Sequence, residues 1–187
     1  MNKPLKLLMI SDIFIFSGFG LISPILAIFI KDNLIGGTIL AAGIASAIFL
    51  ITHSVLQIWF SYKFSPKDRL WMLILGTALI AFVPFGYIFA KSIYHIYGIQ
   101  FIYGLGEAFG YPSWYSLFVT NLDKGERGFQ WSIYSSSVGL GSAVTALAGA
   151  WLAEKTSFEL VFLLTGLISL VGLLTLLKLD KKILRKT

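Results

Sequence analysis

The sequence predicts an all-α, polytopic membrane protein with six transmembrane helices. The first observation is composition: 57% of the 187 residues are hydrophobic and 13% are charged, whereas soluble domains carry roughly 25% charged residues. The second is six apolar runs of roughly 20 residues or more, each long enough to cross a hydrocarbon core about 30 Å thick. The third is the uneven distribution of positive charge between the loops. A soluble, very hydrophobic helical domain is the minor alternative, and it would not need this asymmetry.

The first run, approximately residues 5–30, follows basic Lys3 and Lys6 and so resembles a secretory signal. It is longer than a signal core and contains Asp12, which favours a retained helix. The polar segments 31–33, 65–69 and 123–128 cannot lie cheaply in hydrocarbon and therefore mark interfaces. The remaining runs cover approximately residues 37–61, 70–90, 93–120, 129–153 and 158–177.

Positive charge predicts the orientation of the chain. Three basic residues, Lys31, Lys91 and Lys155, lie in one set of loops. The other twelve of the 15 lie in the alternate set: Lys3, Lys6, Lys63, Lys67, Arg69, Lys124, Arg127, Lys178, Lys181, Lys182, Arg185 and Lys186. Because cytoplasmic loops retain Lys and Arg, we expect a cell (cytoplasmic or inner) membrane protein with both termini in the cytoplasm.

Several classes of function are disfavoured. The chain has no cysteine, which excludes disulfides, thiol catalysis and Cys-ligated metals. Its two histidines lie in no catalytic or metal-binding motif. The net charge of +6 follows the loop rule and does not indicate a nucleic-acid surface. We therefore expect no enzyme activity, no cofactor, no metal and no nucleic-acid partner.

The two halves of the chain resemble each other. Gly18-Phe-Gly20 precedes Pro24, and Gly104-Leu-Gly106 precedes Pro112; each half then reaches an Asn-Leu pair, at residues 33–34 and 121–122. This indicates one domain, 1–187, with repeat 1 at about 5–90 and repeat 2 at about 93–178. Three helices per repeat make the repeat inverted, and Gly- or Pro-interrupted helices at matching positions indicate a transporter binding site. Chance is the alternative, because both residues are common in membrane helices.

A polar and aromatic stripe on the fourth run predicts the site. Its members are three and four residues apart and so share one helix face: Gln100, Tyr103, Glu107, Tyr111 and Trp114. An ionised carboxylate at the depth of Glu107 costs at least about 2.5–3.5 kcal/mol, so we expect it to be protonated, paired or hydrated. In its functional interpretation, Glu107 would bind a cationic group or would take up and release a proton during transport. The alternative is a protonated glutamate that makes a hydrogen bond to another helix.

Two further positions are candidates for substrate or proton binding. Asp12 would pair with Lys6 or Arg127, or else would only be hydrated or stabilise a helix N-terminus. His53 and Gln57 are four residues apart and share a face, where His53 could relay protons. The alternative for His53 is a neutral ring bonded to a neighbouring helix.

Segments 18–30, 104–110 and 123–128 together resemble the major facilitator superfamily, in its first-helix proline motif, glycine-rich fourth helix and loop between helices 4 and 5. The resemblance implies one six-helix half of a twelve-helix fold. It also implies flexible or close-packed points on helices 1 and 4, at Gly18, Gly20, Pro24, Gly104, Gly106 and Pro112.

The loop between helices 2 and 3 departs from the family pattern Gly-x-Leu-Ala-Asp-Arg-x-Gly-Arg-Arg. Tyr62 stands at the Asp, and Ile58 and Ser65 stand at the glycines. Basic residues persist at Lys63, Lys67 and Arg69, and with Arg127 they are candidates for gating. Because Gln100 replaces the expected Arg, and no proline occurs near residues 145–146, the family's usual proton coupling does not carry over.

A lone six-helix bundle would turn its polar face toward lipid, so we expect a partner. The simplest is a second copy about a two-fold axis along the membrane normal; a different half-size partner or a truncated product is the alternative. The predicted function is secondary transport of a small solute, lipophilic or cationic, by alternating access as a homodimer, with proton coupling as one hypothesis. The competing interpretations are a non-transporting accessory subunit and, less favoured, an intramembrane enzyme.

Overall fold

The computed structural model describes residues 1–64 and 69–179, and in these ranges the regular structure is helical. One isolated parallel bridge joins Ile35 to Ser92. The all-α prediction is confirmed. Of the predicted loop residues, Ser65, Lys67, Lys181, Lys182, Arg185 and Lys186 lie outside the described ranges. The helices are α1 (Lys3–Ile22), α2 (Leu26–Asn33), α3 (Ile39–Lys63), α4 (Arg69–Ile88), α5 (Ile93–Asn121), α6 (Arg127–Lys155) and α7 (Phe158–Leu176).

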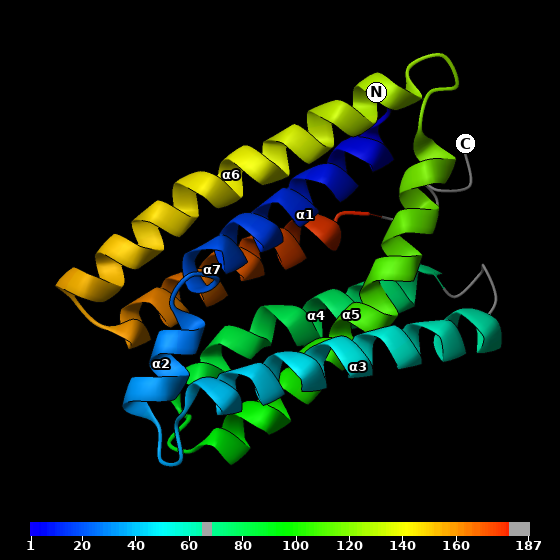
Figure 1. Cartoon of the computed structure of the whole chain (residues 1–187). Coiled ribbons are helices and arrows are strands. Elements are labelled where there is room, and N and C mark those ends of the chain that lie inside the picture. Colours follow the sequence, from blue (N-terminus) through cyan, green and yellow to red (C-terminus); the bar gives the residue numbers. More distant parts are fainter. Residues whose placement is uncertain (65–68, 180–187) are drawn as a thin grey trace.

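The first apolar run forms two helices where one was predicted. Helix α1 ends at Ile22, and α2 turns away from its axis after Pro24 (Figure 1). Proline has no N–H to donate, and its ring clashes with the carbonyl four residues earlier, here that of Gly20. The Ile25 N–H instead donates to the Ile22 carbonyl at 3.0 Å, which closes a tight turn.

The helices form two groups of three (Figure 1). In one group, α1 packs against α6 and α7; in the other, α5 packs against α3 and α4. Helices α4 and α7 join the groups, while α1 and α5 touch over a short stretch only. The first and fourth predicted spans are therefore the central helix of each group.

Loop contacts show that successive helices run back and forth between two ends of the bundle. At one end, the Asn2 amide donates to the Asn121 carbonyl at 3.0 Å. At the other, the Ile35 N–H donates to the Lys91 carbonyl at 3.1 Å, and the Ile93 N–H donates to the Ile35 carbonyl at 3.2 Å. The first end is the one predicted to be cytoplasmic.

Close backbone approach holds the groups together. Between helices in lipid there is little hydrophobic driving force, so association depends on tight packing of small residues. A Cβ added to Gly149 of α6 would lie 2.1 Å from the Leu21 carbonyl oxygen, and one added to Gly76 of α4 would lie 2.4 Å from the Gly110 nitrogen. Both groups therefore contain a seam that accepts glycine only.

Five helices, α1, α3, α4, α6 and α7, are long and apolar enough to cross a membrane. Helix α5 has 29 residues but carries Gln100 and Glu107 among many glycines and tyrosines, and it packs between α3 and α4. The outer surface is apolar instead: Ile51 and Val55 of α3 and Leu167 and Leu174 of α7 are among the exposed large hydrophobic side chains. Lipid is the solvent that such a surface suits.

Candidate functional site

Two carboxylates from different helix groups line one small cavity. Asp12 comes from α1 and Glu107 from α5, with Thr77 of α4 and Tyr111 of α5 beside them. The cavity measures about 20 Å³, which suffices for about one water molecule or an ion of similar size. Two carboxylates on one cavity repel each other when both are ionised, so a proton or a bound cation would stabilise the pair.

The side chain of Asp12 is tied to α6. Its carboxylate accepts a hydrogen bond from the Tyr134 hydroxyl. The ion pair with Lys6 or Arg127, which was one of the interpretations of Asp12, does not form within residues 1–64 and 69–179. Lys6 lies six positions earlier, on a different face of a helix with 3.6 residues per turn, and the exposed Arg127 lies about two turns before Tyr134.

The predicted stripe on α5 divides into a site part and a packing part. Tyr103, Glu107 and Tyr111 are partly accessible, whereas Gln100 and Trp114 are buried. The Trp114 indole N–H donates to the Leu8 carbonyl at 3.4 Å. Trp114 therefore serves packing between α5 and α1, although one side of it lines the acidic cavity.

An aromatic wall extends from the site across three helices. The Tyr103 ring stacks on Phe19 of α1 at 4.9 Å between centroids and on Phe49 of α3 at 4.4 Å. His53 follows Phe49 at 6.0 Å and meets Tyr111 edge-on at 6.1 Å. A larger pocket of about 360 Å³ adjoins Tyr103 and Phe19. The wall could bind a flat or cationic molecule through its ring faces.

His53 does not make the interhelical hydrogen bond through Nε2 that one interpretation expected. This nitrogen is buried and has no hydrogen-bond partner among residues 1–64 and 69–179. Gln57, one turn further along α3, is half-buried. A buried nitrogen without a partner is costly, so it is available to a ligand.

The predicted hinge glycines are close-packed in this conformation. A Cβ on Gly20 would lie 2.2 Å from Thr145 Oγ1, and one on Gly104 would lie 2.7 Å from the Phe49 carbonyl oxygen. Gly18 and Gly106 are tight as well, at 3.2 Å from Ser169 Oγ and 3.0 Å from the Gly76 carbonyl oxygen. Pro24 lies in the break after α1, and Pro112 lies inside α5.

The candidate gating residues lie at helix ends. Lys63 closes α3 and is exposed, Arg69 opens α4, and the exposed Arg127 opens α6. Tyr62, which replaces the family's Asp, is 91% exposed. Of these side chains, Arg69 lines a pocket.

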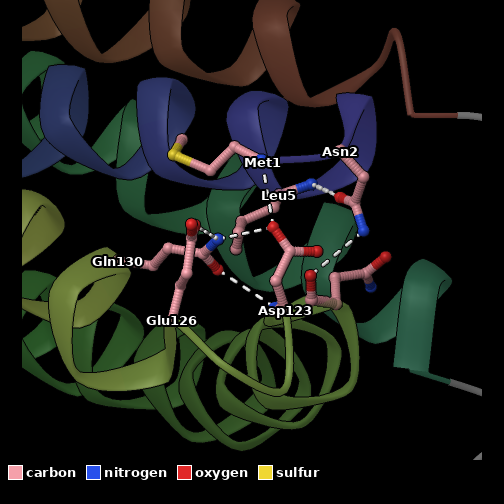
Figure 2. A network of polar contacts seen from close by, with 7 residues as sticks. Met1, Asn2, Leu5, Asp123, Glu126 and Gln130 are labelled. Carbon is pink, nitrogen blue, oxygen red and sulfur yellow. Dashed lines mark hydrogen bonds and ion pairs between the residues drawn. The ribbon is translucent and has the colours of Figure 1, made fainter.

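A polar network fastens the start of α1 to the loop between α5 and α6 (Figure 2). The N-terminal ammonium lies 3.0 Å from the Asp123 carboxylate, and the Gln130 amide donates to Asp123 at 2.6 Å and to Glu126 at 3.2 Å. Hydrogen bonds from the ammonium and from Gln130 hold the pKa of Asp123 below its usual value. The network ties α1 to α6 at this end.

Thr77 and Tyr134 were not among the predicted site residues, and for Tyr134 the polar face of its helix favoured packing over cavity lining. Tyr134 is one of several polar residues on α6, and nothing in its local pattern relates it to Asp12, 122 positions away. The only available signal was an unpaired carboxylate in an apolar helix, which requires a donor from some neighbouring helix.

Comparisons with known proteins agree with this fold. The family model of the Major Facilitator Superfamily matches residues 8–186. A probable sulfoacetate transporter, SauU of Cupriavidus necator, is 29% identical over 131 residues, which cover 68% of this chain and 30% of that protein. The crystal structure of a POT family transporter, PepTSo, superposes with a TM-score of 0.70 at 17% identity, over 95% of this chain and 37% of that one.

The chain thus spans about a third of the length of these two transporters. The structural likeness concerns the fold, while the family match covers nearly the whole sequence. Together with the apolar helices, these matches establish an integral membrane protein of a transporter family. The chain belongs to the major facilitator superfamily.

Proposed function

We propose that this chain is one six-helix half of a secondary transporter that moves a small cationic solute by alternating access. The observation that carries the proposal is the shared cavity of Asp12 and Glu107. These acids come from the central helices of the two groups, so a bound cation would link the groups, and its release would free them to move. The family match supports a transport function rather than an enzymatic one.

The distribution of charge supports a cationic solute. Within the helices, acids line the cavity, whereas the Lys and Arg residues in the described ranges lie at helix ends or in loops. The aromatic wall of Tyr103, Phe19 and Phe49 adds ring faces, which attract cations. SauU is named for sulfoacetate, an anion; for an anion to bind here, positive charge would have to come from another half.

An inverted repeat supports alternating access, because exchange of the two repeats interconverts the two open states. The packing fits such a repeat: α1 lies against α6 and α7 as α5 lies against α3 and α4. Pro24 and Pro112, and Asn33 and Asn121, are separated by the same number of residues, and this spacing also pairs Gly18 with Gly106. Those two glycines face α7 and α4, which are corresponding helices. The pairing of Gly18 with Gly104 that the Gly-x-Gly pattern suggested is therefore revised.

A second copy of the chain is the partner we propose. Helix α6 exposes Leu140, Val144 and Leu147 beside the exposed hydroxyls of Ser135 and Ser136. Hydroxyls in a membrane gain stability by bonding to another helix. A two-fold mate would cover this face and enclose the site. There are two alternatives: a different half-size chain as the partner, and an unrelated protein for which this chain is an accessory subunit. The cross-linking experiment below distinguishes them.

Uptake into proteoliposomes tests the function. The probes are tetramethylammonium, a small permanent cation, and ethidium, whose flat rings also need the larger pocket beside Phe19 and Tyr103, each with and without a pH gradient. Glu107→Gln is expected to reduce uptake at least about tenfold, a loss of about 1.4 kcal/mol of binding or transition-state free energy. The control is Glu154→Gln, an exposed acid at the end of α6. Wild-type uptake by Glu107→Gln would remove the carboxylate from the mechanism, and inert liposomes with hydrolysed lipid would favour an enzyme.

Cross-linking in native membranes tests the assembly. The homodimer predicts a cross-linked mass twice the 20.7 kDa of the chain. A partner of different mass would indicate another half or an accessory role, and active single copies would refute the dimer. Because the chain has no cysteine, single cysteines at Lys124 and Lys91 also test orientation: an impermeant reagent added outside intact cells should label the second only.

A further inference from the structure

A second polar pocket lies apart from the acidic cavity, where the end of α3, the start of α4 and α5 after its midpoint come together. Its volume is about 230 Å³. Among the described residues that line it, Arg69 is charged and none is acidic. The hydroxyls of Ser61, Ser113 and Ser116 face the same space. A guanidinium with neighbouring hydroxyls is a donor set that suits a phosphate or another oxyanion.

Ser113 adds a buried polar residue to the lining of the pocket, next to the more accessible Arg69. The Ser113 side chain is only 4% exposed, and its hydroxyl forms no hydrogen bond with the described part of the chain. Because Ser113 also lines the pocket, its hydroxyl is available to donate to an acceptor oxygen bound there.

The rest of the wall is apolar and firmly packed. Phe60 stacks on Phe109 at 3.9 Å between centroids, and Phe64 meets Trp71 edge-on at 5.5 Å. Met72 completes this side. The pocket therefore combines an anion-binding corner with hydrocarbon surface, which fits an amphipathic ligand better than a free ion.

The position of Arg69 agrees with a lipid headgroup. Arg69 is the first residue of α4, directly after a polar segment, so it lies at the membrane interface. In the loop between the second and third predicted spans, the family pattern has an aspartate, and this chain has the exposed, neutral side chain of Tyr62 at that position. Among the described residues, Arg69 lines the same pocket as Ser61, Ser113 and Ser116. Basic pockets between helices on the cytoplasmic side are suited to anionic lipid headgroups.

We propose that this pocket binds the phosphate of an anionic phospholipid, with Arg69, Ser113 and Ser116 on the phosphate oxygens and with Phe60 and Phe64 against the glycerol and upper acyl chain. The bound lipid would bridge α3, α4 and α5 at the end where the family's gating motif lies. The proposal does not depend on the solute transported, since it concerns a different pocket.

Native mass spectrometry of the purified full chain tests the proposal, with dioleoylphosphatidylglycerol and dioleoylphosphatidylcholine as probes. The wild type should retain phosphatidylglycerol about tenfold more strongly than phosphatidylcholine, and Arg69→Gln should abolish this preference. Lys124→Gln, a loop lysine at the same end, is the control and should retain it. Equal retention of the two lipids by the wild type, or an unchanged preference in Arg69→Gln, would overturn the site.

Two further arms keep the test decisive. Ser113→Ala with Ser116→Ala leaves the charge in place and should still weaken phosphatidylglycerol retention severalfold, which a general effect of charge would not do. Inorganic phosphate and glycerol 1-phosphate are added alone in the third arm. Protection by these free anions equal to that by phosphatidylglycerol would refute a lipid and identify a soluble phosphate instead.

Discussion

The α1 group and the α5 group have corresponding packing but handle their prolines differently. Helix α1 stops before Pro24, whereas α5, which has 29 residues, continues through Pro112 without a break. Each proline removes one backbone hydrogen bond, so the missing bond alone does not decide the outcome. Pro24 is exposed but lies between buried Ile22 and Ile25, and Pro112 is followed by buried Ser113 and Trp114. Burial of the residues next to the proline therefore does not distinguish the two helices either.

The two groups also differ at their acids. Asp12 is bonded to Tyr134 within its own group, whereas the structure records no such bond for Glu107 within residues 1–64 and 69–179. The first acid is therefore fixed by the protein, and the second is available to a ligand. This difference makes Glu107 the stronger candidate for contact with the solute.

The largest effect is expected where the two groups agree, at their glycine seams. Gly149→Ala and Gly76→Ala each place a methyl group against backbone atoms that cannot move aside, at 2.1 Å and 2.4 Å. We expect each to lower the free energy of unfolding by about 3 kcal/mol, measured by denaturant unfolding of the purified chain.

The controls for the seams are Gly139→Ala and Gly98→Ala, where an added Cβ meets nothing within 4 Å. They should equal the wild type or be more stable by up to about 1 kcal/mol, because alanine is the better helix former. If Gly149→Ala is damaging and Gly76→Ala is neutral, the α4–α5 seam is less constrained than the α1–α6 seam, and the correspondence between the groups fails there.

The next effect concerns the tie between α1 and α6. Tyr134→Phe removes the hydroxyl that donates to Asp12 and should lower the free energy of unfolding by about 1–3 kcal/mol, the range for a hydrogen bond to a charged group or a lost buried partner. Tyr111→Phe is the matched control, because Tyr111 lines the same cavity but is 46% exposed. Equal losses in the two variants would show that the Asp12 bond has no special role.

The sequence predicted the helices well because hydropathy and loop charge act locally. All six apolar runs contain the helices expected of them, and the proline that splits the first run was visible beforehand. The split itself was not predicted, since Pro112 shows that the same residue can lie inside a continuous helix. Which outcome occurs depends on neighbours that no local pattern contains.

The candidate site was predicted in part for the same reason. Spacing placed Tyr103, Glu107 and Tyr111 on one face of a helix; in the structure Glu107 and Tyr111 line the acidic cavity, and Tyr103 lines the larger pocket. The spacing did not show that Trp114 would pack against α1 or that Asp12 would lie at the cavity of Glu107, because both depend on how α1 and α5 cross. The donor from Tyr134 depends on the same tertiary contact.

A smaller effect should separate the two prolines. Pro112→Ala restores a backbone N–H that the Ala108 carbonyl can accept, so we expect α5 to gain about 1 kcal/mol, less than the full helix-interior cost of proline because packing at the pocket is lost. Pro24→Ala should change the stability of the chain little, since Pro24 lies outside both helices. Thermal unfolding in detergent measures both. A larger gain from Pro24→Ala would mean that the break in α1 is imposed by proline alone.

The smallest expected effect is on the pH dependence of stability, which should differ between substitutions at the two ends of the bundle. The pKa of Asp123 is lowered in the folded chain by bonds from the N-terminal ammonium and Gln130, so folding favours the carboxylate. Its stabilising contribution is present above the unfolded pKa near 3.9 and disappears as the pH falls through the lower folded value. Asp123→Asn should therefore flatten the loss of stability below about pH 4, measured as unfolding midpoint against pH.

The control is Asp32→Asn, at the opposite end of the bundle. Asp32 pairs with the adjacent Lys31 at 3.5 Å, and both side chains are 54% exposed. This pair lies within one helix and connects no two helices. If Asp32→Asn flattens the profile and Asp123→Asn does not, the network in Figure 2 is not what fastens α1 to α6.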